Sequence, residues 1–199
     1  MANYGSHIGF RWVFNRLSPG APPPIVVRPV ADTYGTKICR GAPVKQETDG
    51  TMSICATAGN VFGVSDGVEQ YYDGTVVRAG IALPATTTYG TNISRQSRLR
   101  VIRAAGQVFS VQADDNTTAT TLAGYQAFVG ENVDHAVGTN VGDESGHVVD
   151  ISGHGTGAED VRIEDIPNRE TTDFTSTGVM LHVSFNLVQD VGLVSTTGV

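Results

Sequence analysis

Leucine and charged residues are scarce in this sequence. Seven of the 199 residues are leucines and 17% are charged, against about 25% charged residues in an average globular chain. Long apolar runs are also missing, since no stretch approaches the roughly 18 uninterrupted apolar residues that a membrane span requires. Arg11 and Arg16 interrupt the apolar part of the first 18 residues, which does not fit a secretory signal. We therefore expect a soluble protein that is made in the cytoplasm, is not exported and has no membrane partner.

Cysteine is nearly absent as well. The chain has two, Cys39 and Cys55, and neither belongs to a CxxC motif. Two cysteines are too few for a disulfide framework, and their spacing does not fit a zinc site. We expect both to be small buried residues; a single disulfide that closes the loop between them is the alternative.

Valine and threonine, in contrast, are abundant, with 26 and 22 residues. Their β-branched side chains favour strands over helices, and 24 glycines with 8 prolines indicate many turns. Apolar residues alternate with others throughout 179–187, which predicts a strand with one core face and one face that is wet or forms an interface. The runs 98–104 and 107–113 predict a hairpin that turns at Gly106, and 119–128 fits a short helix. The fold class predicted is all-β, an antiparallel β-barrel or sandwich.

The first 45 residues differ from the rest in charge. They carry six basic residues and one acidic residue, whereas the remaining 154 residues carry 7 and 19. Four apolar residues recur there at period two, so an extended strand would place them on one face: Ile8, Phe10, Trp12 and Phe14. Prolines within 18–24 predict a polyproline-like spacer. We therefore divide the chain into an extended N-terminal arm, residues 1–45, and an all-β body, residues 46–199.

Two positions are open for the apolar stripe made by these four side chains. The stripe packs on the body of its own subunit, or it docks into a neighbouring molecule, and the sequence favours neither. If it docks, deletion of residues 1–24 is expected to leave a folded body that no longer holds its place on a partner. The basic arm favours an acidic protein surface over nucleic acid, because it lacks the interleaved aromatic residues of a nucleic-acid-binding sheet.

One string has the form of a catalytic motif. Residues 63–67 read GVSDG, a GxSxG sequence in which Ser65 would be the nucleophile of a serine hydrolase. That motif needs a helix directly after the serine, and residues 68–74 have no helical face. We interpret 63–67 as a glycine-flanked β-turn and expect no catalytic residue; a hydrolase acting through Ser65 is the weaker alternative.

Histidines and acidic residues cluster in the C-terminal half, at Asp134, His135, His147, Asp150 and His154. These residue types can ligate a transition metal. On a strand, however, His147 and Asp150 would point to opposite faces. We expect hydrogen-bonded histidines in a loop, with no metal and no other cofactor. The pairs Glu159–Asp160 and Glu164–Asp165 do not fit the spacing of an EF-hand and predict a solvated acidic face.

The C-terminal half resembles a known family. The resemblance rests on residues 108–114 (VFSVQAD), on 138–150 with its GTN and GHVVD strings, on 161–169 (VRIEDIPNR) and on the alternating strand 179–188. Residues 98–188 are similar to the capsid decoration, or cement, proteins of tailed phages. This resemblance implies a β-barrel or sandwich that binds the outside of an assembled head, as a symmetric oligomer and without enzymatic activity.

The function expected from this resemblance is stabilisation of a phage head by bridging neighbouring capsid subunits. The partner is then the major capsid protein, and the chain forms a homo-oligomer, a trimer or a dimer, on the capsid surface of the virion. The residues expected to contact the capsid are Ile8, Phe10, Arg11, Trp12, Phe14, Arg16 and Arg28. The alternative is a tail or fibre module that binds a host surface glycan through Tyr71, Tyr72 and Tyr89.

Overall fold

The structure is a computed structural model and describes residues 8–32, 34–57, 59–85, 92–114, 117–155, 159–167 and 172–189. Strands dominate this part of the chain, which confirms the predicted all-β class. The strands are β1 (Arg11–Asn15), β2 (Ile25–Pro29), β3 (Pro43–Gln46), β4 (Met52–Ile54), β5 (Gly63–Tyr72), β6 (Val77–Gly80), β7 (Arg98–Arg103), β8 (Gln107–Gln112), β9 (Asn132–Ala136), β10 (Val148–Gly155), β11 (Val161–Asp165) and β12 (Met180–Phe185).

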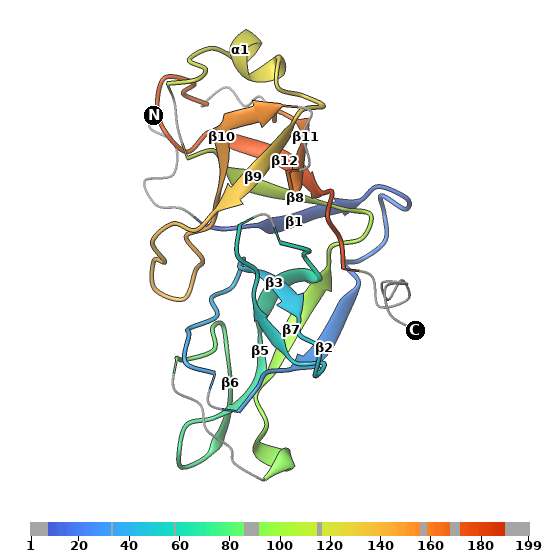
Figure 1. The fold of residues 1–199 in the computed structure, drawn as a ribbon, viewed down its shortest axis with the longest axis vertical. Helices are drawn as coiled ribbons and strands as arrows, with labels where there is room; N and C mark the ends of the chain where they lie inside the picture. Colours follow the sequence, from blue (N-terminus) through green and yellow to red (C-terminus); the bar gives the residue numbers. More distant parts are fainter. Residues whose placement is uncertain are drawn as a thin grey trace.

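These strands form two antiparallel sheets that pack together as a sandwich. Sheet A has the order β1-β8-β12-β11-β9-β10, and sheet B has the order β2-β7-β5-β3-β4 with β6 paired to β5. Figure 1 shows sheet A in the upper half of the molecule and sheet B in the lower half. The α-helix α1 (Leu122–Gln126) lies within the predicted helical window, and η1 (Ile93–Arg95) is a single 3-10 turn. Among the described residues, no helix has the length and hydropathy needed to cross a membrane.

The molecule has two hydrophobic cores, and the first of them joins the two sheets. The first core contains residues of both sheets, including Phe10, Val64, Ile102, Phe109, Val111, Tyr125, Val149, Ile163, Leu181 and Phe185. The second core lies on the opposite face of sheet B and includes Val30, Ile38, Ala42, Val44, Met52, Phe62, Val68, Leu83, Leu99 and Val101. Strand β7 serves both cores, because Leu99 and Val101 face the second core while Ile102 faces the first.

The alternation predicted for 179–187 is confirmed in β12. Leu181 and Val183 are fully buried in the first core, whereas Met180 and His182 are only partly buried on the other face of sheet A. Cys39 and Cys55 are both buried and free, as the sequence predicts.

The predicted hairpin around Gly106 is wrong in its pairing. The turn itself is present, since Gly106 adopts a φ of 69° and the Gln107 amide donates to the Ala104 carbonyl oxygen over 3.1 Å. Strand β7, however, pairs with β2 and β5, and β8 pairs with β1 and β12. Buried Ala104 belongs to the first core, so the chain turns a corner there and passes from sheet B to sheet A.

The N-terminal segment is extended, as predicted, but from residue 8 onward it belongs to the sandwich. Strand β1 is the edge of sheet A beside β8, β2 is the edge of sheet B beside β7, and β3 lies between β4 and β5. The proline-containing residues 18–24 connect the two sheets. Residues 8–45 are therefore part of the body, and the division between a separate arm and a body at residue 45 requires correction over this range. Residues 1–7 lie outside the described residues.

Candidate functional site

A β-bulge divides the apolar stripe of the N-terminal segment between the two faces of sheet A. Trp12 of β1 lies opposite Phe109 of β8, which belongs to the first core. Phe14 lies opposite Val108, so one extra residue, Val13, is inserted between the two pairs. Because one step along a strand reverses the face of the side chain, Trp12 points inward and Phe14 points outward. The prediction of a single four-residue stripe is therefore wrong at Phe14.

Phe10 anchors the segment to its own subunit. It is 1% exposed, and its ring lies 5.0 Å from that of Phe185 and 6.4 Å from that of His135. Its amide donates a hydrogen bond to the Gly41 carbonyl oxygen over 2.9 Å. A side chain buried in this way offers no surface to another molecule, so the expectation that Phe10 contacts a capsid is corrected.

Phe14 instead lines a groove on the outer face of sheet A. This outer groove has a volume of about 280 Å³ and is lined by Phe14, Arg16, Val108, Glu164, Asp165 and His182. It brings two features predicted from the sequence together, namely the end of the N-terminal stripe and the outward face of β12. Its residues come from β1, β8, β11 and β12, and from the loop after β1, so the groove crosses four neighbouring strands of sheet A.

Charges in the outer groove are paired within the chain. Arg16 Nη1 lies 2.9 Å from Glu164 Oε1, and the Ser184 hydroxyl donates to the same oxygen over 2.5 Å. His182 Nδ1 lies 3.9 Å from Asp165 Oδ2. Half of the Arg16 side chain remains exposed, so it is available to a second carboxylate. Arg16 is expected from the sequence to meet acids of another protein, and the structure places one of its partners in the same subunit.

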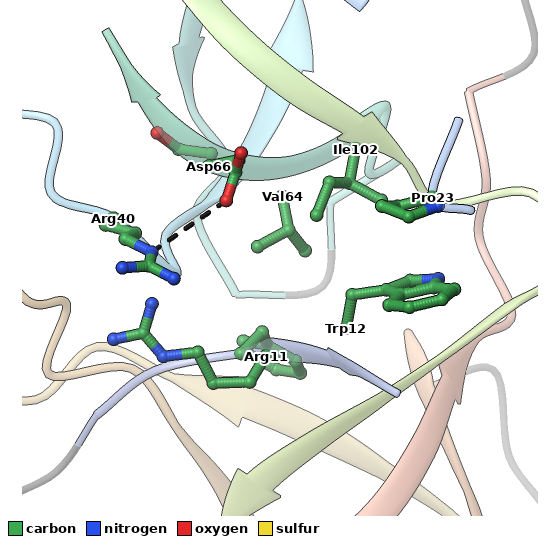
Figure 2. Close-up of a pocket in the computed structure, with 9 residues that line it drawn as sticks. Arg11, Trp12, Pro23, Arg40, Val64, Asp66 and Ile102 are labelled. Carbon is green, nitrogen blue, oxygen red and sulfur yellow. Dashed lines mark ion pairs between the residues drawn. The ribbon is translucent and has the colours of Figure 1, made fainter. Parts of the chain in front are cut away.

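A second concave site lies between the two sheets. This inter-sheet pocket has a volume of about 240 Å³ and is lined by Phe10, Arg11, Trp12, Pro23, Arg40, Val64, Ser65, Asp66 and Ile102. Figure 2 shows the side chains of Arg11 and Arg40 extending toward each other on one side of the pocket, with Val64 in the middle and Ile102, Pro23 and Trp12 on the other side. The Trp12 indole Nε1–H donates to Gln107 Oε1 over 2.8 Å, which fixes the ring.

Positive charge dominates the inter-sheet pocket. Arg11 pairs with Glu144, and Arg40 Nε lies 3.8 Å from Asp66 Oδ1. Asp66 also accepts a 2.8 Å hydrogen bond from Arg100 Nη2. Burial lowers the pKa of the Arg11 guanidinium and the positive charge of Arg40 lowers it further, while Asp66 raises it. The pocket therefore holds two cations close enough to repel each other.

The other predicted contact residues lie outside both sites. The Ile8 amide donates to Gln112 Oε1 over 3.2 Å. The guanidinium of Arg28 stacks over the ring of Phe62 at 5.5 Å from its centroid, and its buried Nε has no hydrogen-bond partner in the described part of the chain. Phe62 belongs to the second core, so Arg28 packs on the body of its own subunit.

The GxSxG string forms a strand and not the predicted turn. Residues 63–67 begin β5, and Gly67, at a φ of 126°, forms a bulge in it. Ser65 is 2% exposed, and its hydroxyl is buried without a hydrogen-bond partner in the described residues. Since β5 continues to Tyr72, no helix follows the serine, and the strand–turn–helix context of a nucleophile elbow is not formed.

We expect Ser65 to be inert toward a fluorophosphonate probe, because the probe cannot reach a fully buried hydroxyl. Intact-mass spectrometry after incubation of the folded protein should show no adduct, and Ser65→Ala should give the same spectrum. Stoichiometric labelling that disappears in Ser65→Ala would show that the hydrolase alternative is correct.

A buried polar network lies beside Phe10, and sequence reasoning missed its composition. The ring of His135 pairs through Nδ1 with Asp160, and its Nε2 lies 3.2 Å from the Cys55 carbonyl oxygen. His147 Nδ1 lies 2.6 Å from the Ser145 hydroxyl, and the two imidazole centroids are 5.7 Å apart. The histidines are hydrogen-bonded, as predicted. His147 lies in the loop just before β10, as expected, whereas His135 lies in strand β9, and both are buried. Asp160 is also fully buried, so its expected place on a solvated acidic face is wrong.

Burial sets the protonation of this network. It lowers the pKa of His147 to about 4, with a smaller contribution from His135, so His147 is neutral at pH 7. It raises the pKa of the Cys55 thiol to about 11, and nearby Asp160 adds to this effect. In the ranges that the structure describes, no group of three His, Cys, Asp or Glu side chains is placed to hold a metal ion. His154 lies instead 3.6 Å from Glu131.

The tyrosines expected to stack on a glycan are largely occupied. The guanidinium of Arg95 lies over the ring of Tyr72, at 4.4 Å from its centroid, and Tyr71 packs against the second core. Tyr89 lies outside the described residues.

Comparison of the whole chain with protein-family models, curated proteins and solved structures finds no match.

Proposed function

We propose that this protein is a structural component of a virion, which binds the outer surface of a tailed-phage head and stabilises it by bridging neighbouring subunits of the major capsid protein. The resemblance of residues 98–188 to capsid decoration proteins supports this proposal. The observation that carries it is the outer groove, where Phe14 and Arg16 meet the outward face of β12.

The composition of the outer groove suits a protein partner. Phe14 supplies an aromatic ring, Arg16 a partly exposed guanidinium and His182 an imidazole. Aromatic residues and arginine are enriched in protein interfaces and provide most hot spots of binding energy. A partner that inserts an apolar side chain against Phe14 and a carboxylate toward Arg16 would match the groove.

A second exposed surface makes bridging possible. All four residues of β6 are exposed, and Val76, Val77 and Ile81 are 47%, 48% and 51% exposed. In the described part of the chain, β6 pairs only with β5, and an open strand edge can accept a strand from another protein. Figure 1 shows β6 in the lower half of the molecule and β1, β8 and β12 in the upper half. Two sites on one packed body can hold two capsid subunits at a set distance.

Bridging allows the protein to bind the head firmly even when each of its contacts with a capsid subunit is weak. Stable protein interfaces bury about 1,000 Å² or more, and simultaneous attachment at two sites raises the apparent affinity well above that of either site. We propose a symmetric homo-oligomer, a trimer or a dimer, which would multiply the number of attachment points further.

Substitutions on the two surfaces test this function. Heads that lack the protein are incubated with Phe14→Glu or with Val77→Lys, and bound protein is measured after sedimentation. Each variant should bind at least about tenfold more weakly than the unchanged protein, because a charge replaces an apolar contact at a site that must be desolvated.

Two substitutions serve as matched controls. Leu17→Glu and Val137→Lys place the same charges at side chains that are 89% and 62% exposed, outside both surfaces, and they should bind as the unchanged protein does. Full occupancy of heads by both Phe14→Glu and Val77→Lys, with unchanged thermal unfolding, would refute the proposed function.

A further inference from the structure

The inter-sheet pocket contains a cation whose hydrogen-bonding capacity is unused. A guanidinium carries five N–H donors, yet in the described part of the chain the Arg40 guanidinium makes no hydrogen bond and has only the 3.8 Å ion pair with Asp66. Its side chain is 43% exposed. The better partner of Asp66 is Arg100, at 2.8 Å. Arg40 is therefore free to reorient toward a ligand without breaking a hydrogen bond.

The position of Arg11 favours a negative charge in the pocket. Arg11 and Arg40 come from different segments, β1 and the loop before β3, and their side chains extend toward each other in Figure 2. Together with Arg100, they place three cations near two anions, Asp66 and Glu144. An anion between Arg11 and Arg40 would relieve their repulsion and would accept paired hydrogen bonds from either guanidinium.

The remaining walls restrict the kind of anion. Trp12, Pro23 and Ile102 form an apolar side next to the two cations, so the ligand needs an apolar group beside its charge. The volume of about 240 Å³ is below the range of about 300–1,000 Å³ usual for small-molecule sites. One carboxylate side chain with an apolar neighbour fits this size better than a nucleotide does.

We infer that the inter-sheet pocket binds an acidic side chain of a protein partner, with its carboxylate between Arg11 and Arg40 and an adjacent apolar residue against Trp12. This inference rests on the proposed function for the existence of a protein partner and adds the chemistry of one contact. The partner segment is an exposed loop or chain end in which an aspartate or glutamate adjoins a leucine, valine or similar residue.

The chain allows a direct measurement of this contact, because Trp12 is its single tryptophan. The probe is the terminally blocked tripeptide Leu-Glu-Leu, titrated into the full-length protein while tryptophan fluorescence is recorded. We expect a saturable change in Trp12 emission. The Leu-Gln-Leu peptide should bind at least about tenfold more weakly, since charge-assisted hydrogen bonds are the ones lost.

Two variants locate the binding site. Arg40→Gln should weaken binding of Leu-Glu-Leu by about tenfold or more. Arg98→Gln, the same change at an exposed position of β7 outside the pocket, should leave it unchanged. Equal binding of the Glu and Gln peptides, no effect of Arg40→Gln, or stronger binding of inorganic phosphate than of the peptide would each overturn the inference.

The measured binding of the protein to heads shows whether this inference or the proposed function has failed. If the peptide fails to bind but heads still retain the protein through the outer groove, the pocket assignment fails and the function stands. If the peptide binds as expected but heads retain no protein, the pocket chemistry stands and the proposed function fails.

Discussion

Replacement of Phe10 by alanine is expected to destabilise the protein by about 3–5 kcal/mol, the usual cost of removing a fully buried phenylalanine. Phe10 is 1% exposed and packs against Phe185 and His135. Its loss would leave a cavity in the first core and loosen the edge strand β1. Equilibrium unfolding in urea, followed by the fluorescence of Trp12, measures the change in free energy.

Phe14→Ala is the matched control, because it removes the same ring from a nearby residue, in β1, whose side chain lies on the outer face of sheet A. It should cost clearly less than Phe10→Ala, since Phe14 lies on the outer face and is only partly buried. Equal and small losses for both variants would mean that Phe10 does not anchor the segment.

The same packing implies that deletion of residues 1–24 removes β1 and a core residue, so the truncated chain should fold poorly. This replaces the expectation of a folded body without its arm.

Acidification is expected to reduce the stability of the protein through His147. Its pKa is about 4 in the folded protein because of burial, followed by the charge of His135, and about 6.5 in an unfolded chain. The unfolded state therefore binds more protons between these two values, so the contribution is fully present above pH 6.5 and declines as the pH falls toward 4. The expected loss across this window is on the order of 3 kcal/mol.

Urea unfolding at about pH 7 and about pH 4.5 measures this loss. His147→Phe removes the titrating group, so the free energy of unfolding should change much less between these two pH values, even if the substitution shifts it at every pH. His154→Asn, at a histidine that is 36% exposed, should keep the full dependence. Asp73 and Asp173 have pKa values lowered to about 2 by hydrogen bonds, so their effects appear at lower pH. An unchanged slope in His147→Phe would contradict the assignment.

Local patterns in the sequence were sufficient to predict features that depend only on which face of a single strand is buried. The alternation in 179–187 identified the buried side of β12, because burial of one face follows directly from a period of two. The abundance of valine and threonine identified the all-β class, and the small number of cysteines identified two buried thiols. These features depend on the residue and its neighbours along the chain, which the sequence displays.

Features that depend on distant partners were not predictable. The turn at Gly106 was recognised, but a turn does not tell whether the strands on either side pair with each other or enter different sheets. The bulge at Val13 inserts one residue into β1, and this single step moves Phe14 from the core face to the outer face. Asp160 looked solvated among other acids, yet its partner is His135, 25 residues earlier in the chain.

The charge asymmetry of the chain also has a structural explanation that the sequence left open. Basic residues of the N-terminal segment pair with acids of the body: Arg11 with Glu144, Arg16 with Glu164, and Lys37 with Asp143. The excess positive charge of the segment therefore meets part of the negative charge of its own subunit. The proposed binding of acids of another protein then involves the partly exposed Arg16 and the pair Arg11 and Arg40 in the inter-sheet pocket.

Electron cryomicroscopy of phage particles that contain this chain tests directly whether the protein bridges neighbouring capsid subunits. We expect density for the sandwich on the outside of the head, with the outer groove against one capsid subunit and the β6 edge against a second. Absence of the chain from the shell, or a position in which it touches a single capsid subunit, would contradict the bridging role.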